Sequence, residues 1–149
     1  MFPLTYLLTP NRKEAEYISE ESINNLEDTR KVAKILYKMG PRYILVKGGH
    51  IDTEDDAVDV LYDGSEFTEF HAKRIETKNT HGTGCTYASA IAAEIAKGND
   101  IEKAIHVAKA YITAAIIKAD SLELGNGHGP INHFQGTIVP VDLNLVMIK

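Results

Sequence analysis

Residues 80–86 read Thr-His-Gly-Thr-Gly-Cys-Thr and lead directly into an alanine-rich segment. In that segment Tyr87, Ile91 and Ile95 recur at helical spacing, which predicts a helix over residues 86–97. The first backbone amides of a helix have no partner within it, and the helix dipole adds positive charge there. Glycine lets an anion approach such amides without a side-chain collision. The segment therefore predicts an anion hole, suited to a phosphoryl group, at the start of an α-helix.

This segment does not match two familiar phosphate-binding sequences. It has no GxxxxGK[ST] pattern, which a Walker A loop requires, and Tyr87 stands where a Rossmann fingerprint needs its third glycine. From the residues alone, two interpretations stay open. One is an anion hole, and the other is an ordinary glycine-rich helix start with capping threonines and a buried thiol at Cys85.

Strands and helices alternate on either side of this segment. Short apolar runs that end at proline or glycine predict strands, apolar positions three or four residues apart predict helices, and Asp63-Gly64 predicts a tight hairpin turn. The expected elements are a strand at 4–9, a helix at 25–39, a strand at 43–46, a hairpin at 57–62 and 66–70, and helices at 86–97 and 101–116. This order predicts an α/β domain in which helices pack against a mainly parallel sheet.

Length and composition restrict the class of protein. At 149 residues the chain has the size of one domain, with 16 Lys and Arg against 21 Asp and Glu and a net charge of -5. That balance excludes a chain-wide positive field for nucleic acid or anionic lipid, so any anion must be bound locally. Because the sequence shows neither a membrane-spanning apolar run nor a secretory signal, we expect a cytoplasmic protein. The single cysteine, Cys85, excludes an internal disulfide.

Three motifs, taken in order, resemble those of the hydroxymethylpyrimidine and phosphomethylpyrimidine kinases, which belong to the ribokinase-like superfamily. They are Thr-Pro-Asn at 9–11 with Glu14, Val-Lys-Gly-Gly-His at 46–50, and Gly-Thr-Gly-Cys at 82–85. The resemblance extends over residues 4–134 and includes a glycine-rich Gly-His-Gly-Pro-Ile-Asn-His tail. It implies a three-layer α/β/α fold with a mainly parallel sheet plus a β-hairpin.

The resemblance also implies an activity. In this family ATP gives its γ-phosphoryl group to a hydroxymethyl or phosphate oxygen of a pyrimidine, in thiamine biosynthesis. Gly82, Thr83 and Gly84 would then form the anion hole, and Cys85 would be the catalytic base that takes the acceptor's proton. A further set of residues is expected to contact ATP and its phosphates: Lys47, Gly48, Gly49, Asn79 and His81.

Asn11 and Glu14 match the family's NxxE motif, which helps to hold Mg2+ and its waters near the ATP phosphates. Amide and carboxylate oxygens are ligands that magnesium accepts. Without the resemblance, the same residues fit a turn followed by the acidic first turn of a helix. Lys47 alone equally fits a solvated lysine after a buried strand, and the glycines at 48–49 fit a plain turn.

The histidines give weaker indications. His128 and His133 share the glycine-rich tail, but no third ligand is placed nearby, so we interpret them as loop or surface residues and predict no zinc site. His81 adjoins the expected anion hole and could orient the loop or a phosphate. His50 closes the Lys-Gly-Gly segment, and we assign it no catalytic role.

The length departs from the family's pattern, because family members are nearly twice as long and these motifs belong to their C-terminal half. We therefore assign residues 1–134 to the C-terminal part of a kinase domain and 135–149 to a tail of unknown role. Most of the pyrimidine pocket belongs to the other half. We expect either a homo-oligomer or association with the missing N-terminal half, because a half-domain exposes a sheet edge and apolar faces.

Three other functions stay open on the sequence. A pyridoxal or pyridoxine kinase of the same superfamily can share the Gly-Thr-Gly-Cys motif. A half-domain could bind nucleotide without catalysing a reaction. A thiol enzyme could use Cys85 as its nucleophile, although the sequence places no histidine and acid partner beside it.

Overall fold

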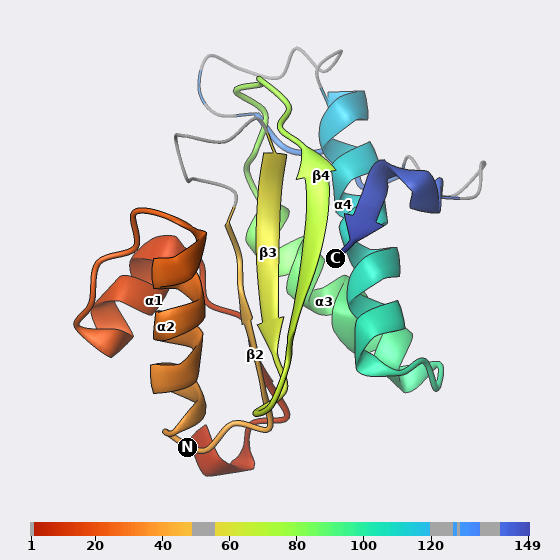
Figure 1. The fold of residues 1–149 in the computed structure, drawn as a ribbon. Coiled ribbons are helices and arrows are strands. Elements are labelled where there is room, and N and C mark those ends of the chain that lie inside the picture. Colours follow the sequence, from red (N-terminus) through yellow and green to blue (C-terminus); the bar gives the residue numbers. More distant parts are fainter. Residues whose placement is uncertain (1, 49–55, 120–126, 128, 135–140) are drawn as a thin grey trace. The chain divides into compact units, whose positions relative to one another are not determined.

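The computed structural model describes residues 2–48, 56–119, 127, 129–134 and 141–149 (Figure 1). The chain divides into two compact units. The first unit is Met1–His71 with Ile148–Lys149, and the second is Ala72–Met147. The predicted phosphate and metal motifs are split between them, because Asn11 and Lys47 belong to the first unit and Cys85 to the second.

The strands of the described residues form one sheet in the order β1(Leu7–Leu8), β2(Tyr43–Val46), β3(Asp56–Tyr62), β4(Phe67–Lys73), β5(Val146–Ile148). β1 pairs with β2 in parallel, and β2 pairs with β3 antiparallel. The described sheet is therefore mixed, where the sequence predicted a mainly parallel one. The physical reason is the connection at residues 47–55, which is shorter than the dozen or more residues that a parallel crossover needs.

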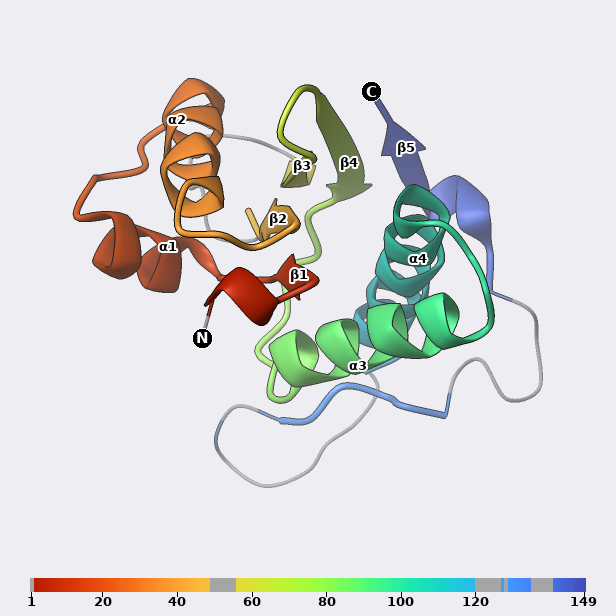
Figure 2. The same cartoon turned by 90° about the horizontal axis from the view of Figure 1, so that it is seen from below.

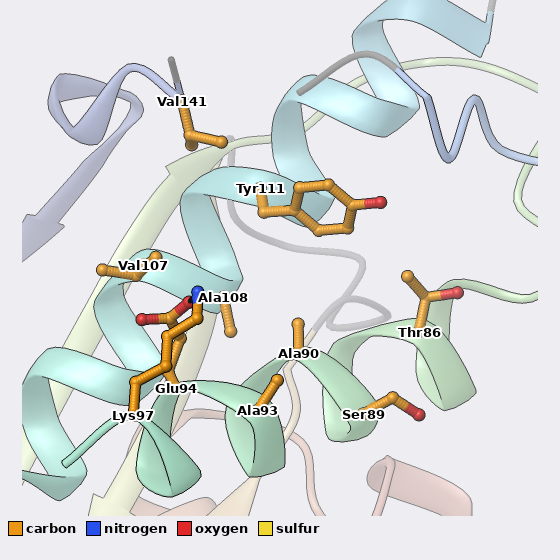
Figure 3. A pocket seen from close by; sticks show the side chains of 10 residues that line it. All are labelled: Thr86, Ser89, Ala90, Ala93, Glu94, Lys97, Val107, Ala108, Tyr111 and Val141. Atoms are coloured by element: carbon orange, nitrogen blue, oxygen red, sulfur yellow. Dashed lines mark hydrogen bonds and ion pairs between the residues drawn. The ribbon is translucent and has the colours of Figure 1, made fainter. Parts of the chain in front are cut away.

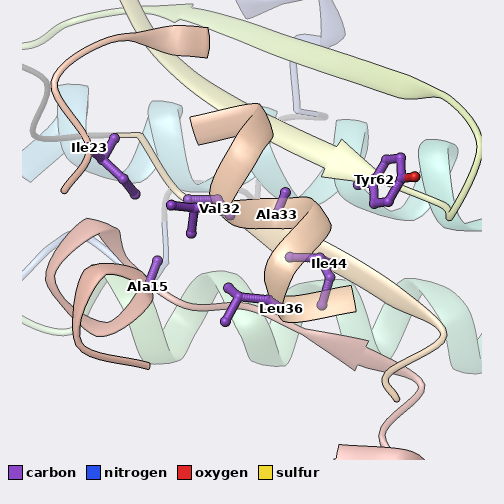
Figure 4. Close-up of a cluster of buried hydrophobic side chains, with 8 residues drawn as sticks. Ala15, Ile23, Val32, Ala33, Leu36, Ile44 and Tyr62 are labelled. Carbon is purple, nitrogen blue, oxygen red and sulfur yellow. The ribbon is translucent and has the colours of Figure 1, made fainter. Parts of the chain in front are cut away.

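Two helices and the strands of the first unit enclose a hydrophobic core. α1(Arg12–Ser19) begins at Asn11, and α2(Leu26–Tyr37) begins at Asn25, whose side chain accepts a hydrogen bond from the amide of Asp28 at 2.9 Å. The apolar side chains between these elements are buried (Figure 4): Ala15, Ile23, Val32, Ala33, Leu36, Ile44, Val46 and Tyr62. Burying each larger one contributes about 1.5–3 kcal/mol, so this core holds β1 and β2 in register.

A charged cluster joins β4 to α2 within the same unit. The buried Glu69 carboxylate accepts one hydrogen bond from the Arg30 guanidinium, and its other oxygen lies 3.1 Å from Nε2 of His71. The hydrogen bond that Arg30 donates to Glu69 raises the pKa of Arg30 above its ordinary value. Because removing one member of a buried charge pair leaves the other uncompensated, the cluster fixes how the hairpin meets α2.

The predicted hairpin is confirmed by β3, β4 and their turn. Gly64 adopts a φ of 102°, and the Asp63 side chain accepts hydrogen bonds from the amides of Ser65 and Glu66, each at 2.7 Å. These backbone hydrogen bonds lower the pKa of Asp63, the one from Glu66 having the largest effect. The turn is thus closed by a charged acceptor as well as by glycine.

The second unit is built on two packed helices, α3(Thr83–Ala96) and α4(Ile101–Ala119) (Figure 2). α3 begins at Thr83, whereas the pattern predicted residue 86, because Gly82 already forms the N-cap. Alanines let the two helices approach closely, and α4 buries seven apolar side chains: Ala104, Ile105, Ala108, Ala110, Ile112, Ala115 and Ala119. Among the helices of the described residues, none combines the length and apolar character that crossing a bilayer requires.

Candidate nucleotide-phosphate site

The start of α3 has the properties of an anion hole. Gly82 is the N-cap, with a φ of 87° that suits glycine, and as glycine it has no side chain to cap the helix. Within the described residues, the amides of Gly84 and Cys85 have no hydrogen-bond partner, whereas the amide of Thr83 donates to Thr80 O at 3.3 Å. Gly84 and Cys85 are also exposed. Two unpaired amides at the positive end of a helix dipole are therefore open to a ligand.

Cys85 lies in the first turn of α3. Its thiol is free and exposed, so it is not the buried thiol that the sequence also allowed. A side chain at this position projects beside the amides that would bind a phosphoryl group. That placement suits a group that takes a proton from an acceptor held at the same site.

Asn79 anchors the loop that precedes α3. Its side chain is 3% exposed, and its amide nitrogen donates to Ala119 O at 2.7 Å. Gly129 packs directly on it, because a Cβ added at Gly129 would come within 2.0 Å of Asn79 Oδ1. In this structure Asn79 therefore ties the loop to the end of α4.

His81 and the glycine-rich tail pair as two short parallel segments. The amide of His81 donates to Gly129 O at 3.1 Å, and the amide of Ile131 donates to His81 O at 3.4 Å. The His81 side chain is exposed. The backbone of His81 thus fixes the loop, and its imidazole stays accessible at the helix start.

Asn11 and Glu14 form a capping box at the start of α1. Asn11 Oδ1 accepts from the amide of Glu14 at 3.0 Å, and Glu14 Oε2 accepts from the amide of Asn11 at 2.7 Å. Both residues are exposed. The arrangement leaves Glu14 Oε1 without a partner among the described residues, so one carboxylate oxygen is available to a cation.

These residues fit magnesium as a partial ligand set. Across the described residues, no group of three or more His, Cys, Asp or Glu side chains could hold a metal ion by itself. Magnesium commonly binds through one or two carboxylates and completes its shell with water and substrate phosphates. The single available oxygen of Glu14 matches that mode, and a dedicated protein cage is not needed.

Lys47 lies next to the Asn11 motif at the ends of β1 and β2. Its amide donates to Pro10 O at 2.9 Å, and Asn11 and Lys47 form an isolated parallel bridge. The carboxyl ends of adjacent parallel strands are where α/β proteins bind ligands. The structure thus brings together Asn11 and Lys47, two of the residues that the sequence analysis singled out.

Gly48 is required by the sheet itself. It is buried, its amide donates to Asp59 Oδ1 at 3.0 Å, and a Cβ at this position would lie 1.8 Å from Val58 O. The close approach of β3 therefore explains this glycine, whether or not a nucleotide also approaches it. Gly49, His50 and His128 lie outside the described residues.

Sequence reasoning missed two contacts at the helix start. Thr86 Oγ1 and His133 Nε2 are 3.0 Å apart, and the Tyr111 hydroxyl donates to His133 O at 2.6 Å. The sequence analysis treated His133 as a loop or surface residue. The sequence offered one indication, because His133 closes the glycine-rich Gly-His-Gly-Pro-Ile-Asn-His tail. Its partner, Thr86, is distant in sequence and could not be predicted.

A cavity of about 440 Å³ lies between α3 and α4 of the second unit (Figure 3). Small and apolar side chains form much of it, and an ion pair between Glu94 and Lys97, at 2.5 Å, lies at one side. Its lining residues are Thr86, Ser89, Ala90, Ala93, Glu94, Lys97, Val107, Ala108, Tyr111 and Val141. The cavity reaches Thr86 in the first turn of α3 but does not include Cys85.

These features define the class of protein first. The α/β architecture is that of the ribokinase-like fold. The same fold occurs in the pyridoxal kinase from Staphylococcus aureus, solved in complex with AMP-PCP and pyridoxal. That structure superposes with a TM-score of 0.90 at 29% sequence identity and covers 100% of this chain and 54% of the other.

Within that class, the family is also defined. The family model for phosphomethylpyrimidine kinase matches residues 1–132, and the chain belongs to this family. It is 42% identical over 134 residues to the hydroxymethylpyrimidine/phosphomethylpyrimidine kinase of Bacillus subtilis, covering 90% of this chain and 49% of that protein. The resemblance carried by the three motifs is thereby confirmed.

A longer relative shows the same match. The thiamine biosynthesis bifunctional protein of Geobacter sulfurreducens is 51% identical over 133 residues, which cover 89% of this chain and 26% of that protein. The chain thus spans about half of the Bacillus kinase and about a quarter of the bifunctional protein. The matched region is the C-terminal part of these relatives.

Proposed function

We propose that the chain is the C-terminal part of an ATP-dependent kinase that phosphorylates hydroxymethylpyrimidine, its monophosphate, or both, in thiamine biosynthesis. The observation that carries the proposal is the start of α3, where the amides of Gly84 and Cys85 are unpaired within the described residues. Family membership supplies the reaction class, and the names of the relatives supply the pathway.

The proposed reaction divides between two kinds of group. An acceptor oxygen forms a bond to the γ-phosphorus of ATP while the bond to the β,γ-bridging oxygen breaks, and ADP leaves with that electron pair. The Cys85 sulfur, as its thiolate, takes the acceptor's proton and becomes the neutral thiol. The amides of Gly84 and Cys85 stabilise negative charge on the transferring group. Because the transition state is loose, charge stabilisation and positioning outweigh proton removal.

Cys85→Ser is expected to retain measurable turnover. General base catalysis contributes about 10²- to 10⁴-fold, and a loose transition state places this base toward the low end. We therefore predict that kcat falls by roughly 10²-fold and that the KM for ATP changes little. Steady-state ADP release on the active fusion described below gives both values. If Cys85→Ser lost as much activity as Gly84→Leu, whose side chain blocks the helix start, proton removal would matter as much as charge stabilisation. That result would contradict the proposal.

Glu14 has two roles in the proposal: it caps α1, and its charge binds Mg2+. A substitution can test the charge while it keeps the cap. Glu14→Gln keeps an oxygen that accepts the Asn11 amide, but it removes the carboxylate charge. We expect the half-saturating Mg2+ concentration to rise by about 3- to 10-fold, because magnesium prefers charged oxygen ligands. The Tm should change little, since the cap is preserved.

The matched control is Glu20→Gln, at the exposed C-cap of the same helix. It removes the same charge away from the Asn11 motif and should leave the Mg2+ dependence as in wild type. Mg2+ titrations of ADP release compare the two variants. An unchanged Mg2+ requirement in Glu14→Gln would refute the assignment.

The remaining predicted ATP contacts form part of the same proposal. We propose that Lys47 and His81 contact phosphates, since the Lys47 side chain follows β2 and that of His81 is exposed beside α3. Asn79 supports this region through its buried bond to Ala119. Gly48 and Gly49 complete the proposed set of nucleotide contacts.

A second candidate substrate is pyridoxal or pyridoxine. The structure that favours it is the Staphylococcus aureus pyridoxal kinase, whose backbone covers the whole of this chain at a TM-score of 0.90. A third candidate is nucleotide binding without catalysis, which is favoured by the match to only 49% of the Bacillus kinase. We propose association with an N-terminal half or with further copies, and a cytoplasmic location.

One experiment separates these candidates. ADP release is measured with hydroxymethylpyrimidine, its monophosphate and pyridoxal, on the chain alone and on a fusion that places the N-terminal half of the Bacillus subtilis kinase before it. We expect release by the fusion with the pyrimidines. Release only with pyridoxal would favour the second candidate, and magnesium-dependent ATP binding without release would favour the third. Silence in all assays, with no ATP binding, would remove the kinase proposal.

A further inference from the structure

The imidazole of His133 lies against the first turn of α3. Its Nε2 is 3.0 Å from Thr86 Oγ1. The same ring edge faces Gly82, because a Cβ built on that glycine would come within 3.9 Å of Nε2 and 4.0 Å of Cε1. The ring therefore contacts Thr86 in the first turn of α3 and lies near the N-cap residue.

The backbone that carries this ring is fixed to α4. The Tyr111 hydroxyl donates to His133 O at 2.6 Å, and the amide of Asn132 donates to Ala115 O at 3.1 Å. Phe134 N donates to Asn132 Oδ1 at 3.1 Å and closes the turn. Although the His133 side chain is exposed, its place beside α3 is determined by three hydrogen bonds around it.

The hydrogen bond to Thr86 has a consequence for the amides. The amide of Thr86 donates to Gly82 O at 3.0 Å and is the first hydrogen bond of the helix. The N-cap residue, Gly82, has no side chain that could cap α3. A helix start without a cap frays readily, and the contact from His133 replaces the missing restraint.

We propose that His133 is a positioning residue of the anion hole: through the Thr86 hydroxyl it holds the first turn of α3, so that the amides of Gly84 and Cys85 stay aimed at a phosphoryl group. This inference rests on the proposed function for the identity of the anion. It concerns the alignment of the site, and His133 itself takes no part in the transfer of the proton.

The test compares His133→Ala with His133→Asn in the full chain. Hydrogen exchange by NMR gives the protection of the Thr86 amide without any ligand, and calorimetry gives the affinity for Mg-ATP. We expect His133→Ala to speed exchange at Thr86 by about 5- to 10-fold, the size of one hydrogen bond, while exchange at Ile95 stays unchanged. Affinity for Mg-ATP should fall by a similar factor, and His133→Asn should restore both.

The matched control is His106→Ala. His106 Nε2 lies 3.0 Å from Leu143 O and 3.2 Å from Val146 O, away from the start of α3. Its loss should lower the Tm and leave exchange at Thr86 and the ATP affinity as in wild type. A merely structural role for His133 would give this same pattern and would overturn the proposal.

The two possible failures are distinguishable. If wild-type protein does not bind Mg-ATP, the proposed function fails, whereas exchange at Thr86 still decides whether His133 holds the helix start. If wild type binds Mg-ATP but His133→Ala leaves both exchange and affinity unchanged, the positioning role is wrong and the proposed function stands.

Discussion

Gly84→Leu is expected to abolish phosphoryl transfer while leaving the protein as stable as wild type or more so. Gly84 is exposed in the first turn of α3 and is not among the glycines with positive φ. Leucine is a good helix former, and glycine in a helix costs about 0.8–1.0 kcal/mol relative to alanine. Helix propensity therefore favours leucine over glycine at this position.

Its effect on function should be large. The side chain would stand beside the amides of Gly84 and Cys85, which are unpaired within the described residues. Removing a single donor of an oxyanion hole typically costs 10²- to 10³-fold in kcat. Because the leucine blocks access to both amides, we predict a loss of at least about 10³-fold in the fusion, together with loss of Mg-ATP binding by the chain alone.

Two variants control for other causes. Ala92→Leu places the same side chain on the exposed surface of α3, away from its start, and should keep activity and Tm. Gly84→Ala should give an intermediate loss. ADP release and thermal unfolding are measured on all three. An active Gly84→Leu protein with normal Tm would show that the phosphoryl group binds elsewhere.

Gly48→Ala is expected to have the largest effect on stability. Its Cβ would lie 1.8 Å from Val58 O, and the obstacle is backbone of β3 rather than a movable side chain. The shift needed to relieve the clash would also break the hydrogen bond from the Gly48 amide to Asp59. Overpacking typically costs about 1–3 kcal/mol, and the lost buried hydrogen bond adds about 1–3 kcal/mol. We therefore predict a fall in Tm of roughly 10 °C or failure to fold.

The control is Gly127→Ala, because no atom of the described residues lies within 4 Å of a Cβ at Gly127 and its φ is not positive. That variant should keep the wild-type Tm. Circular dichroism during heating compares the two. A Gly48→Ala protein with the Tm of wild type would mean that β2 and β3 do not approach as described.

The fold was predictable where the local pattern is strong. The strand expected at 43–46 coincides with β2, and the Asp63-Gly64 turn lies between β3 and β4. Strand pairing was less predictable, because an apolar run shows that a strand is buried without showing its neighbour. The described sheet is mixed because β1 pairs with β2 in parallel and β2 pairs with β3 antiparallel. The apolar pattern of each strand does not specify these partners or their directions.

The site was predictable as a set of motifs but not as a set of contacts. The capping box of Asn11 and Glu14 is local and could be read from their spacing. The anchoring of Asn79 by Ala119 and the contact of His133 with Thr86 join residues that are 40 and 47 positions apart. Such contacts depend on how α4 and the tail return to the loop, which no local pattern encodes.

The most direct test of the central claim is an NMR titration of the ¹⁵N-labelled chain with ATP in the presence of Mg2+. If the start of α3 binds the phosphates, the amide resonances of Gly84 and Cys85 should move downfield and show the largest changes in the second unit. Resonances that stay fixed at Gly84 and Cys85 at saturating nucleotide, whether or not others move, would contradict the account.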